Sequence, residues 1–280
     1  KRAMSGYYPY LLSGLPDLDF EMDLSGFSYE EIYAQVVELL TARDRETLEL
    51  FLAFGTHREA AAGYLSARDE EDRITWLQET RLPRYQREVF SKSLSSLVFA
   101  EEDRAVDMDA EELEAGIVRV LDEAFYKAVL RHGNPFMRKW FEFDGILKNT
   151  LVAFAARKQG RSPENDFVEQ ASAPMLDWIR ENMDEGDFGL KQKLSYATEM
   201  FEALDRPDVY ERERAIDRFR WNMAEEMTSG KDFQLDKVLC YMVKAAILRR
   251  WQKMDAGAGR EYLHEVVSQM RKVNLQGEDA

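Results

Sequence analysis

Residues 140–160 read Trp-Phe-Glu-Phe-Asp-Gly-Ile-Leu-Lys-Asn-Thr-Leu-Val-Ala-Phe-Ala-Ala-Arg-Lys-Gln-Gly. Between residues 146 and 156 most positions are apolar, and on a 3.6-residue period they cover most faces of a helix instead of one stripe. A helix of this kind lies in the interior of a helical assembly. We therefore expect residues 146–156 to be buried on most of their faces.

A second segment, residues 238–250, has the same character. Each segment contains one interrupting lysine, Lys148 or Lys244, and each ends in two consecutive basic residues. Positive charge in the last turn of a helix interacts favourably with the helix dipole, so the basic pairs indicate two helix C-termini. We expect residues 238–248 to be buried as well, and an internal repeat stays open as an interpretation.

Start and stop signals place further helices along the chain. Ser28 and Glu31 form a capping-box pattern, Asn134 with Pro135 is a cap followed by a first-turn proline, and Gly160 is a typical helix end. No run of alternating β-branched residues predicts a strand. The sequence predicts an all-α protein of about ten helices, at 28–40, 44–55, 68–81, 83–99, 109–133, 135–160, two short helices divided near Pro174, 190–204, 209–227, 235–255 and 260–273.

Two regions interrupt this pattern. Residues 7–27 show no helical periodicity but contain many aromatic residues, so we expect an extended segment that docks on the helices. Residues 101–114 are strongly acidic and are typical of a solvated linker. We therefore expect an N-terminal extended segment with a helical subdomain over 1–105 and a main helical domain over 106–280, with one continuous domain as the alternative.

Composition excludes several classes of protein. The net charge of −15 repels nucleic acid and anionic lipid head groups. The single cysteine, Cys240, excludes an intrachain disulfide and a cysteine metal cluster, and it fits a reducing compartment. No apolar run is long enough to cross a bilayer, and the N-terminus lacks the pattern of a secretory signal. We expect a cytoplasmic protein.

The sequence contains no recognised motif for catalysis or cofactor binding. His57, His132 and His264 lie far apart, and Glu261 with His264 has the spacing of a di-iron ligand pair but no second pair. A P-loop, a dinucleotide fingerprint and a nucleophile elbow are not found in the sequence. We expect no catalytic residues, no metal site and no cofactor.

The helix at 135–160 resembles one in a known family. Asp144 is followed by Asn149, then by Arg157 and Lys158 before Gly160, a pattern similar to one in the central-stalk subunit of the vacuolar- and archaeal-type rotary ATPases. Residues 241–257 are similar to the closing helices of that family. Residues 7–18, Tyr-Tyr-Pro-Tyr-Leu-Leu-Ser-Gly-Leu-Pro-Asp-Leu, resemble a divergent bacterial branch of it.

This resemblance implies an all-α, funnel-like or bundle-like fold and a non-enzymatic function. The family's subunit sits on the membrane rotor ring, receives the foot of the central shaft and transmits torque during ion transport. The resemblance thus implies two partners, the shaft and the ring, with contact to the membrane only through the ring. A helical enzyme and an unrelated helical adaptor remain the alternatives.

Basic and aromatic residues on two helices are the candidate partner contacts. Aromatic residues and arginines are favoured where proteins grip their partners. The candidates stand out against an acidic chain, and they are Arg138, Lys139 and Trp140 on one helix and Arg249, Arg250 and Lys253 on another. The competing interpretation is that these cations pair with carboxylates of the chain itself.

Overall fold

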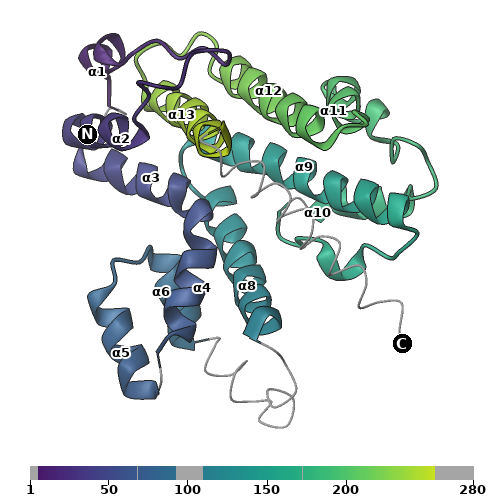
Figure 1. The fold of residues 1–280 in the computed structure, drawn as a ribbon, viewed down its shortest axis with the longest axis horizontal. Coiled ribbons are helices and arrows are strands. Elements are labelled where there is room, and N and C mark those ends of the chain that lie inside the picture. Colours follow the sequence, from purple (N-terminus) through teal and green to yellow (C-terminus); the bar gives the residue numbers. More distant parts are fainter. Residues whose placement is uncertain (1–5, 68, 93–109, 172, 256–280) are drawn as a thin grey trace. The chain divides into compact units, whose positions relative to one another are not determined.

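The fold is all-α in the computed structural model, which describes residues 6–67, 69–92, 110–171 and 173–255 (Figure 1). Those ranges contain no strand, only an isolated bridge between Tyr7 and Gln234. The helices are α1 (Pro9–Gly14), α2 (Tyr29–Leu39), α3 (Ala42–Leu52), α4 (His57–Leu65), α5 (Glu70–Glu79), α6 (Arg84–Lys92), α8 (Ala110–Leu130), α9 (Pro135–Gln159), α10 (Ala173–Glu181), α11 (Ala197–Leu204), α12 (Val209–Met227) and α13 (Leu235–Asp255), with 3₁₀ turns η1 (Ala53–Thr56), η2 (Glu164–Asp166) and η3 (Leu190–Gln192).

Several sequence predictions concern residues outside the described ranges. They are the domain boundary near residue 105, most of the acidic linker, the helix at 260–273, and Glu261 with His264. Among the described residues, no helix is long and apolar enough to cross a membrane.

The chain divides into two compact units. Unit 1 contains residues 1–41 and 217–280, and unit 2 contains residues 42–216. This division differs from the predicted boundary near residue 105. The physical reason is that α4 and α6, which precede that position, both pack against α8, which follows it, and all three helices belong to unit 2.

The N-terminal segment of unit 1 docks on the helices, as the aromatic content predicts. The backbone N–H of Tyr8 donates to Phe233 O at 2.6 Å, and the hydroxyl of Tyr241 on α13 donates to Pro16 O at 2.8 Å. The buried hydrophobic side chains of the segment are Tyr8, Leu11, Leu15, Phe20 and Phe27. The prediction that the segment lacks a helix is wrong for α1, where proline occupies the first helical position and presets the backbone.

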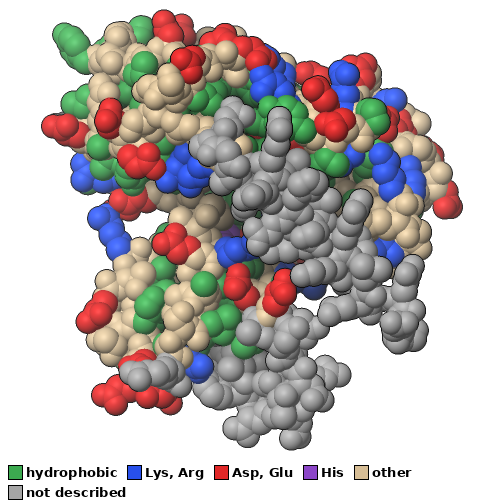
Figure 2. Space-filling view, viewed as in Figure 1, with side chains coloured by type: hydrophobic (Ala, Val, Ile, Leu, Met, Phe, Trp, Pro, Cys, Tyr) green, Lys and Arg blue, Asp and Glu red, His purple; other side chains and the backbone are tan. Residues whose placement is uncertain are grey.

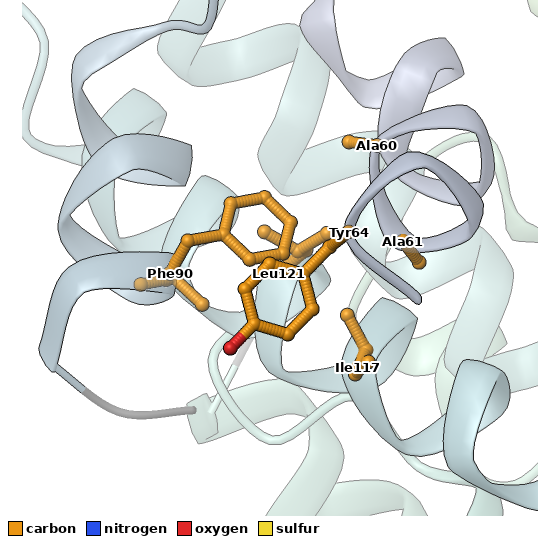
Figure 3. Packing of buried hydrophobic residues seen from close by; sticks show 7 residues of the cluster. Ala60, Ala61, Tyr64, Phe90, Ile117 and Leu121 are labelled. Carbon is orange, nitrogen blue, oxygen red and sulfur yellow. The ribbon is translucent and has the colours of Figure 1, made fainter. Parts of the chain in front are cut away.

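The core of unit 2 lies where α4, α6 and α8 meet (Figure 3). Tyr64 of α4 stacks on Phe90 of α6 with ring centroids 4.9 Å apart, and Leu121 of α8 is fully buried in the same cluster. The sequence prediction had no helix at α4. Its alanines and Gly63 give little apolar periodicity, but a Cβ at Gly63 would lie 2.9 Å from the Trp76 ring, so the small residues allow close packing by α5.

Other predicted helices are shorter than expected. Of the two short helices predicted around Pro174, the first is only the 3₁₀ turn η2, and α10 begins at Ala173, so Pro174 lies in its first turn instead of dividing two helices. The predicted helix at 190–204 is divided into η3 and α11. Gly189, with φ of 65°, precedes η3 in a left-handed conformation that suits glycine.

The two apolar segments are buried, as predicted. No residue from 146 to 156 is exposed, and between 238 and 248 only Ala246 is exposed. Both segments lie within long helices, α9 in unit 2 and α13 in unit 1, and α13 packs against α2. These helices therefore form much of the interior of their units.

We expect Leu121→Ala to destabilise unit 2 by about 2–5 kcal/mol, because the fully buried side chain would leave a cavity between α4, α6 and α8. Ile74→Ala on α5 is the matched control, since Ile74 is 50% exposed, and it should change stability by no more than about 0.5 kcal/mol. Urea unfolding followed by circular dichroism measures both. Equal losses in the two variants would contradict the assignment of this core.

Candidate functional site

The helix α9 begins and ends at the residues that the sequence indicated. The side chain of Asn134 accepts from the backbone N–H of Met137 at 2.7 Å, and Pro135 occupies the first turn. Gly160 ends the helix with φ of 68°, and its N–H donates to Ala156 O and Arg157 O. Both ends of α9 are therefore fixed locally.

Asp144 and Asn149 are buried within α9, with exposed fractions of 1% and 0%. The carboxylate of Asp144 accepts from the hydroxyl of Tyr126 on α8 at 2.8 Å. The side chain of Asn149 binds the backbone of Val168 in both directions, because Nδ2 donates to Val168 O at 3.2 Å and Oδ1 accepts from Val168 N at 3.0 Å. These two residues join α9 to α8 and to the segment before α10.

Arg157 links the C-terminal end of α9 to a loop of unit 2 by hydrogen bonds. Its guanidinium donates to three backbone carbonyl oxygens at 2.6–2.9 Å, those of Met183, Glu185 and Gly186. The same group lies 3.9 Å from the centre of the Phe188 ring. Three of the residues that carry the family resemblance, Asp144, Asn149 and Arg157, therefore make contacts inside unit 2.

The three candidate contact residues at the start of α9 have different surroundings. Arg138 is half-buried and donates to His132 O at 2.6 Å, and Lys139 is exposed. Trp140 is only 5% exposed, and its ring packs against Phe136 and Phe143. As placed, Trp140 is a core residue of unit 2, because the apolar face of α9 extends back to its first turns.

Two candidate arginines on α13 pair with carboxylates of unit 1. Arg249 binds Glu30 at 2.7 Å and lies over the Tyr29 ring, and Arg250 binds the buried Asp217 at 2.8 Å. This is the competing interpretation made from the sequence. Reversing either charge would disturb the packing of unit 1 as well as any partner contact.

Lys139 and Lys253 are the two exposed lysines among the candidates. Neither forms an ion pair with another residue that the structure describes. On the face drawn in Figure 2, acidic and basic side chains are interspersed over the described surface. An exposed, unpaired cation on this acidic chain is available to an acidic partner.

A polar network in unit 2 was not predicted from the sequence. Nδ1 of His57 on α4 lies 2.6 Å from Oδ1 of Asp122 on α8, and Nε2 lies 2.5 Å from the hydroxyl of Tyr85 on α6. Nζ of Lys148 on α9 is 3.7 Å from Oδ2 of Asp122. In the sequence His57 lies far from the other histidines, and Asp122 is 65 residues away with no spacing rule that relates the two.

Lys148 lies in an aromatic environment. Its Nζ is 3.6 Å from the centre of the Phe54 ring and 5.8 Å from that of Tyr126. Burial lowers the pKa of Lys148, and the carboxylate of Asp122 acts in the opposite direction. Burial also raises the pKa of the Tyr85 phenol well above its usual value.

The order Asp122–His57–Tyr85 resembles that of an oriented general base, but its geometry favours a structural role. Tyr85 is 7% exposed and His57 only 2%, so the hydroxyl has no open path to a substrate. Over the described part of the chain, no group of three or more His, Cys, Asp or Glu side chains could hold a metal ion. The network instead links four helices of unit 2.

Replacing Asn149 tests the link to Val168. We expect Asn149→Ala to lower stability by about 1–3 kcal/mol, because it leaves the N–H and C=O of Val168 without their buried partner. Lys139→Ala on the same helix should have almost no effect on chemical denaturation. If the Asn149 variant unfolds at the wild-type midpoint, these two bonds do not stabilise α9.

We expect the Lys148 ammonium to lose its proton at a lower pH than a lysine in a short model peptide, because burial disfavours the charged form. In Asp122→Asn the pKa of Lys148 should fall further, since the neighbouring carboxylate is removed. NMR titration of the lysine side chains, assigned with Lys→Arg variants, measures both values. Titration of Lys148 at the same pH as the lysine of the model peptide would contradict the burial of this ammonium.

The comparisons with known proteins place the chain in one family. Residues 4–274 match the sequence model described as "Protein of unknown function (DUF2764)". No curated protein and no solved structure is significantly similar to the chain. Because the match extends over nearly the whole sequence, the chain belongs to the DUF2764 family.

Proposed function

We propose that this chain is a non-enzymatic central-stalk subunit of a vacuolar- or archaeal-type rotary ATPase. In this function it couples the rotor shaft to the membrane ring during ion transport. The observation that supports the proposal is that three residues of the α9 pattern that resembles the family make hydrogen bonds inside unit 2. Asp144, Asn149 and Arg157 bind Tyr126, Val168 and the 183–186 loop respectively.

A part that transmits torque must resist deformation. Close packing of large side chains gives protein interiors low compressibility. In unit 2 the rings of Phe125 and Phe141 meet at 4.7 Å, and those of Phe51 and Phe141 meet at 5.2 Å. Together with the anchors on α9, this packing supports a stiff mechanical element.

Partner contacts in this proposal centre on the two exposed lysines. Lys139 lies on α9 of unit 2 and Lys253 on α13 of unit 1, so each unit offers one cation to a partner. One unit would receive the shaft and the other would rest on the ring. The subunit would then be cytoplasmic and would reach the membrane only through these partners.

Charge reversal at the two lysines tests the proposal. We expect Lys139→Glu and Lys253→Glu each to weaken binding to one of the two partners several-fold at low salt, with a smaller effect at moderate salt. Binding of the purified chain to the shaft subunits and to the isolated ring is measured by pull-down and interferometry. Arg249 and Arg250 are left unchanged, because they hold Glu30 and Asp217.

Lys127→Glu is the matched control, since Lys127 is an exposed lysine on α8 and its reversal changes the net charge by the same amount. It should bind both partners as the wild type does. If the wild-type chain binds neither the shaft nor the ring, the proposed function is wrong. If it binds and all three variants bind equally, the placement of the contact surfaces is wrong.

A further inference from the structure

The hydrogen bonds around His57 extend to Gln86, which is fully buried on α6. Nε2 of Gln86 donates to the hydroxyl of Tyr85 at 2.9 Å and to Oγ1 of Thr56 at 3.2 Å. The Thr56 hydroxyl in turn donates to Ala53 O at 2.7 Å. Oε1 of Gln86 is buried and has no hydrogen-bond partner among the described residues. Nε2 of Gln86 therefore makes two hydrogen bonds, whereas Oε1 makes none with the described residues.

These contacts define the direction of each hydrogen bond. Because the Tyr85 oxygen accepts from Gln86, its own proton is directed at Nε2 of His57, 2.5 Å away. Nε2 is then an acceptor, and the ring proton resides on Nδ1 and is donated to Asp122 at 2.6 Å. These donors and acceptors correspond to the Nδ1–H tautomer of His57.

We propose that protonation of His57 causes the side-chain amide of Gln86 to flip, so that Oε1 and Nε2 exchange positions. A proton on Nε2 would be donated to the Tyr85 oxygen, so the phenol proton would need another acceptor. Oε1 of Gln86, which has no hydrogen-bond partner among the described residues, can accept this proton. It reaches the Tyr85 hydroxyl only after the amide has flipped, because Nε2 occupies that position now. The same buried side chains can thus form two hydrogen-bond patterns, one with neutral His57 and one with protonated His57.

The exchange changes how unit 2 is held together. When the amide flips, Oε1 replaces Nε2 beside Thr56, and the single hydroxyl proton of Thr56 can be donated to Oε1 or to Ala53 O but not to both, so one of the two hydrogen bonds of Thr56 is lost. An unmade hydrogen bond of a buried donor is costly. Uptake of a proton by the network therefore weakens the hydrogen bonding of Thr56 at the end of η1, which makes the network a proton-sensitive element of the fold.

Charged and titratable groups approach His57 from several elements. Asp122 comes from α8, Tyr85 from α6, and Lys148 from α9 through Asp122. On α5, Arg73 lies over the Tyr64 ring instead. Asp122 is the carboxylate that would balance a protonated ring, so the two charge states can both exist inside unit 2.

NMR of the full-length chain tests this inference. The ring nitrogens of His57 and the side-chain amide of Gln86 are assigned with His57→Gln and Gln86→Glu variants and then followed from neutral to acid pH. We expect the neutral Nδ1–H pattern at high pH and a change of the Gln86 amide shifts with the same midpoint as His57. Hydrogen exchange at residues 53–56 should accelerate over that same pH range.

Tyr85→Phe removes the hydroxyl that connects the two groups, so His57 should still titrate while the Gln86 amide no longer changes. Tyr64→Phe is the control, because it removes the hydroxyl of another buried tyrosine in unit 2, and there the two titrations should remain coupled. The wild-type titration alone decides the matter if Tyr85→Phe does not fold. Unchanged Gln86 signals across the His57 titration, or a His57 that never titrates before acid unfolding, would overturn the inference.

Discussion

Burial of α9 is the constraint on which the rest of unit 2 depends. Most of this helix is removed from water, so each polar side chain that is buried on it needs a hydrogen-bond partner in the protein. Asp144 finds the Tyr126 hydroxyl, Asn149 finds both backbone groups of Val168, and Thr150 donates to Ile146 O. A buried helix could be shifted along its axis at little cost if it were wholly apolar. The bonds of Asp144 and Asn149 fix the position of α9 against α8 and the segment before α10.

The same constraint bears on function. A residue that satisfies a buried group cannot also contact a partner, so the anchors of α9 leave the outer surface to perform recognition. Gly145 contributes to this close packing, since a Cβ there would lie 2.6 Å from the Ala171 oxygen. Stiff interior helices with exposed lysines at separate sites would suit the proposed coupling function. Three residues of the α9 pattern, Asp144, Asn149 and Arg157, make contacts inside unit 2.

Local signals in the sequence were sufficient for much of the fold. The caps at Ser28, Asn134 and Gly160 act within a few residues, and the structure has each of them as predicted. The helix α4 could not be predicted, because its stability comes from packing against α6 and α8. The contact of His57 with Asp122 could not be predicted either, because it joins residues that only the tertiary fold brings together.

Surface exposure was the least predictable property. Trp140 was placed among the partner contacts because it is aromatic and near a helix start, yet its ring lies between Phe136 and Phe143. Arg250 looked available from its sequence neighbours, but Asp217, which it binds, is 33 residues away and 1% exposed. Charge and residue type identify candidate contacts, whereas long-range pairing determines which of them remain free.

Native-state hydrogen exchange of α9 tests the central claim most directly, since that claim is that anchored polar groups make this helix the rigid centre of unit 2. The account predicts that backbone amides from residue 144 to residue 153 exchange only through unfolding of the whole unit, with a free energy of opening that falls with denaturant as global stability does. Exchange of these amides through small local openings, as fast as that of the exposed helix α5, would contradict it.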